Sequence, residues 1–274
     1  MTKTVKIYSE NDKFQNIETL KRNREKRNKL GQFFVEGVRN INQALEHDWK
    51  INSFLYSPEK ELSGWAKDIL KNSTAAFHYE LPLALLQKLS GKEETSELVA
   101  TIEIPADDLN RIPVTNNPLV VVFDRPASPG NLGTIIRSCD ALGVDGLIIT
   151  GHAVDVYDPE TVSATTGSLF SVPVVRLPSQ KELMPWVEQL KQKFPGLKLV
   201  GADEKSETDI AEYDFKQPTI LLIGNETWGL SAAYKELCDH LVNIPMHGSA
   251  SSLNVASATS IVLYEIDRQR RLRK

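Results

Sequence analysis

Three short polar segments hold the side chains of this chain that could take part in chemistry. In the first, Ser128–Arg137, a Pro-Gly turn precedes Asn131, and Arg137 follows six residues later on an otherwise mostly apolar helical pattern. This arrangement is either a capped helix with a surface arginine or a loop that presents an amide and a cation to a ligand. The glycine spacing matches neither a dinucleotide fingerprint nor a phosphate-binding P-loop.

The second and third segments each follow an apolar run. Glu226, within Gly224–Gly229, comes soon after such a run, where a carboxylate is unfavourable unless it caps the next helix or serves a site. Ile244–Asn254 is rich in small residues and carries the polar pair Ser252 and Asn254. Taken alone, this third segment is also consistent with a plain helix-initiating turn. Each segment by itself therefore leaves its role open.

The elements that must position the three segments are those of an α/β sheet. Short apolar runs rich in β-branched residues are typical of buried parallel strands, and they lie at 119–124, 146–150, 197–202 and 219–224. A helical pattern after the first run starts at Asn131, in an N-cap-like position, and stops before Gly143. Ligands bind at the carboxyl ends of the strands in such sheets. The three segments all fall at predicted strand-to-helix junctions, so they should meet there.

The first part of the chain predicts a smaller α/β unit. Strand patterns alternate with helical ones, the strands at 33–35, 51–56, 75–79 and 98–104, and the helices at 38–47, 59–70 and 82–89. Residues 105–118 contain three prolines and polar turn clusters without a sustained period, which is typical of a linker. We therefore predict an N-terminal domain at 1–105, a linker at 106–117 and a C-terminal domain at 118–274.

Composition and charge narrow the class of protein. The two cysteines, Cys139 and Cys238, have no Cys or His neighbours at metal spacing, so we expect a cytoplasmic chain with no disulfide and no metal. No apolar run approaches the roughly 18 residues that span a bilayer, so we expect no membrane partner. The net charge of −4 speaks against nucleic acid, but six basic residues crowd 21–29 and five lie within 268–274. These two clusters are either solvated helix faces or RNA-binding surfaces.

Taken together and in order, the three segments resemble the motifs of the SpoU (TrmH-like) branch of the SPOUT RNA methyltransferases. The matching residues are Asn131 with Arg137, Gly224-Asn225-Glu226 with Gly229, and Ile244-Pro245-Met246 with Gly248 followed by Ser252-Leu253-Asn254-Val255. The stretch Phe33–Gly37 also resembles the opening strand of the family's L30e-like substrate-binding domain. Each motif alone is moderately specific, whereas three in order at strand-to-helix junctions are highly specific.

The resemblance implies a fold, a cofactor and an assembly. The fold would be α/β, with a C-terminal SPOUT domain that contains a deep trefoil knot and an N-terminal L30e-like domain that binds RNA. The methyl donor would be S-adenosylmethionine (AdoMet), and the chain would form a homodimer through the knotted domain. The residues that match the family's cofactor-binding positions are Gly224, Ile244, Pro245, Met246 and Leu253.

The reaction that the resemblance implies is methyl transfer to a ribose 2′-hydroxyl of RNA. The residues that match catalytic positions are Asn131, Arg137, Glu226, Ser252 and Asn254. The family proposal makes the arginine at the position of Arg137 the general base. Because a guanidinium is charged in nearly all proteins, Arg137 would instead stabilise the developing alkoxide or bind the adjacent phosphate. Glu226 is then the alternative base.

The resemblance also bears on the RNA partner. We expect Arg24, Arg27 and Arg39 to contact RNA phosphates. The L30e-like domain resembles ribosomal-RNA binders, which favours 23S rRNA over tRNA as the substrate. A non-catalytic RNA-binding or assembly protein with the same fold is the remaining alternative, and the presence of both Arg137 and Glu226 counts against it.

Two positions depart from the family pattern. Where many members carry an arginine near Ser163, this chain has none, which puts a phosphate contact there in doubt. Trp228 stands where a small residue is common, and it would either reshape the acceptor pocket or stack on a base.

Overall fold

The chain passes three times between two compact units. The computed structural model describes residues 2–272, so Arg273 and Lys274 of the second basic cluster lie outside the described residues. Unit 1 runs to Pro105 and also includes Asp155–Phe170, whereas unit 2 comprises Ala106–Val154 and the chain from Ser171 onward. The segment 155–170 is thus an excursion from the second half of the chain into the first unit.

Unit 1 is built on a five-stranded mixed sheet with the order β1-β4-β3-β5-β2. Its strands are β1 (Lys3–Lys6), β2 (Gln32–Glu36), β3 (Ile51–Tyr56), β4 (Phe77–Glu80) and β5 (Val99–Glu103). β4 pairs in parallel with β1 and β3, and β5 pairs antiparallel with β3 and β2. The four strands predicted in this part of the chain are confirmed, and β1 is an additional strand that the sequence did not predict.

The first helix of unit 1 buries apolar side chains at helical spacing. Helix α1 (Asp12–Arg22) begins after Asn11, whose side chain accepts hydrogen bonds from the next turn, and it buries Phe14, Ile17 and Leu20. Those three side chains join a core cluster with residues of β2, β3, α5 and β5. The other helices are α2 (Arg24–Leu30), α3 (Val38–Glu46), α4 (Gly64–Asn72) and α5 (Leu83–Ser90).

The excursion 155–170 folds as helix α7 (Pro159–Thr165) and the short 3₁₀ turn η2 (Ser168–Phe170). Its aromatic side chains pack on β2, because the ring of Phe33 lies 4.8 Å from that of Tyr157 and 6.3 Å from that of Phe170, between centroids. The indole nitrogen of Trp49 donates a hydrogen bond of 2.9 Å to the carbonyl of Phe170. Tyr157 near the start of the excursion and Phe170 at its end therefore both pack in the core of unit 1.

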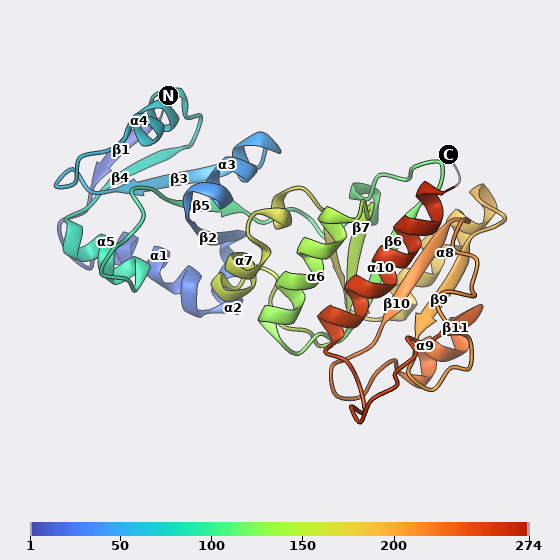
Figure 1. The fold of residues 1–274 in the computed structure, drawn as a ribbon. Coiled ribbons are helices and arrows are strands. Elements are labelled where there is room, and N and C mark those ends of the chain that lie inside the picture. The colour runs from blue at the N-terminus through green and yellow to red at the C-terminus, as the bar shows by residue number, and fades with distance from the viewer. Residues whose placement is uncertain (1, 273–274) are drawn as a thin grey trace. The chain divides into compact units, whose positions relative to one another are not determined.

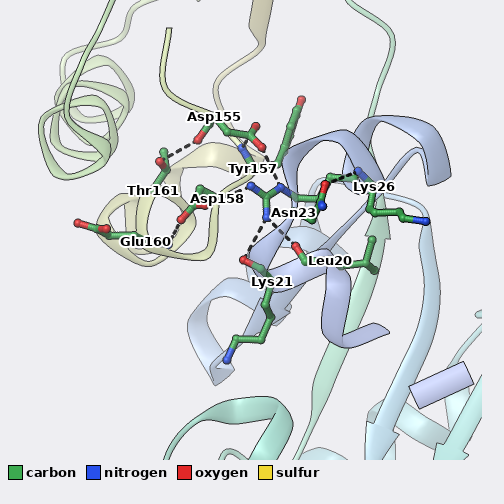
Figure 2. A network of polar contacts seen from close by, with 10 residues as sticks. Leu20, Lys21, Asn23, Lys26, Asp155, Tyr157, Asp158, Glu160 and Thr161 are labelled. Carbon is green, nitrogen blue, oxygen red and sulfur yellow. Dashed lines mark hydrogen bonds and ion pairs between the residues drawn. The ribbon is translucent and has the colours of Figure 1, made fainter. Parts of the chain in front are cut away.

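A buried guanidinium secures the start of the excursion, and it corrects one of the RNA-binding predictions. Arg27 is 2% exposed. Its Nε donates to the carboxylate of Asp155 at 2.8 Å, and its NH2 donates to that of Asp158 at 3.1 Å. NH1 donates to the backbone carbonyls of Leu20 and Lys21, so the group is satisfied on every side (Figure 2). Arg27 therefore lacks the exposure that contact with an RNA phosphate requires.

A second member of the same basic cluster is also part of the fold. The Nζ of Lys21 donates to the carbonyls of Leu89 and Ser90 at 2.5 and 2.8 Å, at the end of α5. Burial lowers the pKa of Lys21 from its ordinary value. A lysine at this place offsets the partial negative charge of a helix C-terminus.

Unit 2 is built on a six-stranded sheet in which every strand pair is parallel. The order is β11-β9-β10-β6-β7-β8. The strands are β6 (Leu119–Asp124), β7 (Gly146–Thr150), β8 (Val174–Leu177), β9 (Lys198–Ala202), β10 (Thr219–Ile223) and β11 (His240–Val242). The predicted parallel α/β sheet is confirmed: β11 is the short strand at the apolar run before the third segment, and β8 is a further strand that the sequence did not predict. The chain order reverses between β6 and β10, which makes this pair the switch point of the sheet.

Helices cover both faces of this sheet. Helices α6 (Pro129–Ala141) and α10 (Val255–Arg271) lie side by side on one face, where the hydroxyls of Ser138 and Ser260 are 2.8 Å apart (Figure 1). Helices α8 (Gln180–Lys193) and α9 (Ala232–Leu237) pack on the core cluster of the other face. Among residues 2–272, no helix has both the length and the apolar character needed to cross a membrane.

The segment 106–117 belongs to unit 2 and contains the 3₁₀ turn η1 (Leu109–Arg111). Ile112 is buried in the core of the unit beside strands of the sheet. Arg270, near the end of α10, donates to the carbonyl of Asn117 at 2.9 Å and to that of Gln217 at 2.8 Å. The second basic cluster thus also contributes a cation to the fold, and burial lowers the pKa of Arg270 to about 10.

The Arg27 network yields a prediction about stability. Replacing Arg27 by Met leaves two carboxylates without their cation, which should lower the free energy of unfolding by about 3–5 kcal/mol. Lys29→Ala, an exposed change on the same helix, should leave it within about 0.5 kcal/mol of the parent value. Urea unfolding of both variants is the measurement, and equal midpoints would contradict the prediction.

Candidate active site

The three predicted segments meet at the carboxyl ends of the central strands of unit 2. Strand β10 pairs with β6 so that Ile223 lies opposite Phe123. The loops that follow these two strands therefore leave the sheet as neighbours. The third segment runs from β11 to the start of α10, which lies beside α6 (Figure 1).

The carboxylate of Glu226 joins the first two segments. One oxygen accepts a hydrogen bond of 2.9 Å from the backbone of Ala127, and the other accepts one of 2.9 Å from Ser128. The second oxygen also accepts from the side-chain amide of Asn131 at 3.3 Å. A negative group thus satisfies free N–H groups at the start of α6, where the helix dipole favours it.

Two asparagines extend this connection to the third segment. The side-chain nitrogen of Asn254 donates to the side-chain oxygen of Asn131 at 3.0 Å. The oxygen of Asn254 accepts from the backbone of Ala256 at 2.9 Å and of Ser257 at 3.3 Å, so the same residue caps α10. Glu226, Asn131 and Asn254 therefore form one chain of hydrogen bonds, which we call the Asn131 chain.

The expectation that Asn131 is the N-cap of the first helix is wrong. Helix α6 begins earlier, at Pro129, and its N-cap is Ser128, whose hydroxyl accepts from the backbone of Asn131 at 3.3 Å. Proline at the first helical position has a φ that suits a helix start and no N–H to satisfy. The side chain of Asn131 is consequently left to bind across the three segments.

Asn225, named above within the second motif but given no role there, is a structural residue of the site. Its side-chain nitrogen donates to the carbonyl of Arg125 at 2.7 Å, and its oxygen accepts from the backbone of Thr227 at 2.9 Å. Its backbone pairs with Gly229 in both directions at 3.0 Å, which closes a tight turn. A Cβ at Gly224 would lie 2.1 Å from the backbone of this turn, so that position requires glycine. An asparagine directly after a buried strand was the signal available in the sequence.

Arg137 and Ser252 lie outside the Asn131 chain. Arg137 is exposed on α6, and none of the described residues forms a hydrogen bond or ion pair with its guanidinium. Ser252 is also exposed, and its hydroxyl forms no hydrogen bond with any of the residues 2–272. Hydrogen bonds therefore join three of the five predicted catalytic residues, Asn131, Glu226 and Asn254, and leave Arg137 and Ser252 apart from them.

A pocket of about 500 Å³ opens beside the Asn131 chain. Four of the five predicted cofactor-binding residues line it, namely Gly224, Ile244, Met246 and Leu253, and Pro245 is not among its lining residues. Glu226 and Ser252 line it as well. A separate cavity of about 340 Å³ lies within unit 1, and no predicted site residue lines it.

The loop after β9 also lines the pocket, and the sequence analysis missed it. Its residues Asp203, Glu204 and Lys205 face the pocket, together with Lys235 of α9. Burial would raise the pKa of Asp203, but the ion pair with Lys235 and the backbone N–H of Lys205 hold it below its ordinary value. Within the part of the chain that the structure describes, no cluster of three His, Cys, Asp or Glu side chains is placed to hold a metal ion.

Comparison with known sequences identifies the family. The profile of the SpoU rRNA methylase family matches residues 118–264, and that of the SpoU L30e-like domain matches residues 11–100. The chain belongs to the SpoU rRNA methylase family. A 23S rRNA (uridine(2479)-2′-O)-methyltransferase of Streptomyces viridochromogenes is 51% identical over 265 residues, which are 97% of this chain and 92% of the relative.

Two solved structures extend the comparison within the SpoU family. The methyltransferase AviRb of Streptomyces viridochromogenes in complex with AdoMet has a TM-score of 0.89 and 51% identity, covering 95% of this chain and 98% of its own. An AdoMet-bound rRNA methyltransferase of Sinorhizobium meliloti has a TM-score of 0.84 and 30% identity, covering 97% of this chain and 98% of its own. The structural similarity to these two proteins therefore covers both units of this chain.

The two roles of Asn254 can be separated by substitution. Asn254→Ala removes the cap of α10 and should lower the free energy of unfolding by about 1 kcal/mol. Asn254→Ser retains a capping oxygen but is too short to keep the amide bond to Asn131, so it should remain within about 0.5 kcal/mol of the parent. Thermal unfolding measures both, and equal destabilisation of the two variants would show that the cap is not what Asn254 contributes.

Proposed function

We propose that this chain transfers a methyl group from AdoMet to a ribose 2′-hydroxyl of 23S rRNA. The observation that carries the proposal is the Asn131 chain, which ties three strand-to-helix loops together at the mouth of one pocket. The relative that is 51% identical is named as a 23S rRNA 2′-O-methyltransferase, and this supports the same reaction and substrate class here.

The residues of the pocket fit AdoMet. Ile244, Met246 and Leu253 offer apolar surface for a flat adenine, and the exposed backbone of their loop offers hydrogen-bonding groups. Two similar structures hold AdoMet. When bound, AdoMet supplies an electrophilic methyl group carried on a sulfonium.

Among the described residues, the predicted catalytic side chains include three positioning groups and one unpaired cation. Both oxygens of Glu226 accept hydrogen bonds from the backbone at the start of α6, so this carboxylate holds the first loop. We therefore assign Glu226, Asn131 and Asn254 to holding the loops and the ribose. Arg137 keeps its donors available, and we assign it to stabilising the charge that develops on the 2′-oxygen or to binding the adjacent phosphate.

The finer features of the fold are also part of the proposal. We expect residues 1–105 to be an L30e-like RNA-binding domain, 106–117 a linker, and 118–274 the methyltransferase domain, which would contain a deep trefoil knot. A homodimer through the knotted domain would cover Ile261 and Tyr264 of α10, which are 39% and 55% exposed. In such a dimer, the exposed Arg137 of one subunit could lie at the active site of the other. A ribosomal-RNA substrate places the enzyme in the cytoplasm.

The RNA surface in this proposal uses Arg24 and Arg39, which are both exposed in unit 1. Arg39 lies against the turn at the end of α7, because a Cβ at Gly167 would be 3.6 Å from its Cγ. The chain has no arginine near Ser163 in that segment, and Arg39 of α3 is a basic residue whose side chain lies beside the turn that follows it.

The proposed function is tested by incubating the purified chain with radiolabelled AdoMet and separate pools of unmodified 23S rRNA and tRNA, followed by nucleoside mapping. Label on a ribose 2′-oxygen of the 23S rRNA is the expected result. Label in the tRNA pool would show that the substrate is tRNA and not 23S rRNA. Label on a base would show that the methyl acceptor is not the ribose. An absence of both label and AdoMet binding would favour a non-catalytic RNA-binding protein.

Arg137 should be indispensable for turnover. Arg137→Ala is expected to lower kcat by about a hundredfold or more, since one preorganised charge at a developing oxyanion has an effect of that order. Arg137→Lys should recover part of the rate if charge alone is needed. Thr134→Ala, one turn earlier on the exposed side of α6, serves as the control, and near-native turnover of Arg137→Ala would remove Arg137 from the mechanism.

Removal of the proposed phosphate-binding cations should change the response of RNA binding to salt. The double variant Arg24→Ala/Arg39→Ala should bind 23S rRNA more weakly, and the slope of log K against log salt should fall by about 0.7 for each phosphate that is no longer neutralised. Lys193→Ala, an exposed cation on α8, should leave the slope unchanged. Filter binding at several salt concentrations measures it, and an unchanged slope in the double variant would exclude both arginines.

A further inference from the structure

Three exposed apolar side chains line the proposed cofactor pocket, and one of them, Trp228, has no function assigned above. Trp228 is 79% exposed, and Met246 and Leu253 are each 38% exposed. All three line the same pocket. A concentration of exposed apolar side chains at the edge of a pocket marks a binding surface.

The fold itself does not use the indole of Trp228. The indole nitrogens of Trp49 and Trp65 donate hydrogen bonds to Phe170 and Asn42, and Trp186 is buried. The indole of Trp228 makes no hydrogen bond to any residue between 2 and 272. A large aromatic side chain that is both exposed and without a structural partner is available for a ligand.

The backbone beneath this indole is held firmly. Trp228 N donates to the side-chain oxygen of Asn225 at 3.2 Å, and the turn is closed by the paired backbones of Asn225 and Gly229. Gly229 has a φ of +64°, which glycine adopts without strain. A side chain on a fixed turn loses little backbone entropy when a ligand settles on it.

The surroundings of Trp228 match a nucleotide. Glu226, which belongs to the Asn131 chain and is proposed to hold the ribose, lines the same pocket as Trp228. The same pocket is lined by the exposed cation Lys205, with Glu204 as its acidic neighbour. Proteins bind unpaired nucleotides with aromatic faces for the bases and cations for the phosphates.

We propose that Trp228 is a stacking platform for an unpaired nucleobase of the RNA substrate, beside the ribose that is methylated. The inference rests on the proposed function and adds a residue that selects and positions the acceptor. A protein partner is a weaker candidate for this surface. Met246 and Leu253 beside it belong to the surface proposed for adenine, so Trp228 alone would face such a partner, whereas α10 presents Ile261 and Tyr264 together.

The test compares Trp228→Ala and Trp228→Phe with the parent chain in the methylation assay on a 23S rRNA transcript. Loss of one base stack should raise KM for the RNA by about tenfold to a hundredfold in Trp228→Ala, and Trp228→Phe should recover most of it. The Kd for AdoMet, measured by calorimetry without RNA, should stay unchanged in both. Tyr8→Ala removes an equally exposed aromatic side chain of unit 1 and should change neither constant.

Each other outcome overturns the inference. An equal rise in the Kd for AdoMet would make Trp228 a wall of the cofactor pocket. A change in the molecular mass in solution for Trp228→Ala would make it part of a protein interface. An unchanged KM for RNA would leave it without a role in substrate binding. If the parent chain itself transfers no label, the proposed function fails first, and RNA binding by the two variants then decides the stacking separately.

Discussion

The candidate site depends on the parallel pairing of β10 with β6. This register places the ends of two strands side by side although a hundred residues separate them in the chain. Glu226, in the loop after β10, can then reach the backbone of Ala127 and Ser128, and a register slip of one residue would shift that loop along β6 by about 3.3 Å. The Glu226 carboxylate thus links the loops that follow β10 and β6. Asn131 and Asn254 extend this hydrogen-bonded link to the start of α10.

Several basic residues of this chain form hydrogen bonds or ion pairs within the fold. Arg27 is held by two carboxylates, Lys21 by carbonyls at a helix end, and Arg270 by carbonyls near two strand starts. A cation surrounded by fixed acceptors is satisfied at that place and is not free to bind RNA. Fewer residues of the two basic clusters are therefore available to RNA than the sequence suggests.

The strands of unit 2 were predictable because burial on both faces leaves an unbroken apolar run, as in 119–124 and 219–223. The three motifs could be found because their glycines, amides and carboxylate fall at strand ends. The burial of Arg27 could not be predicted, since its partners Asp155 and Asp158 lie far along the chain and a run of charges does not reveal which member turns inward. The place of Asn131 was misjudged for a local reason, because Ser128 with Pro129 begins the helix one turn earlier.

The excursion of residues 155–170 into unit 1 limits how this protein can be recombined. A crossover at residue 105 is the obvious place to exchange the first domain for that of another family member. Such a chimera would set a foreign β2 and α2 against the parent's Tyr157, Asp155 and Asp158, whose packing partners are Phe33 and Arg27. The two parts of unit 1 must therefore be inherited together, so that a change on one side of this buried contact constrains the residues that evolution can accept on the other.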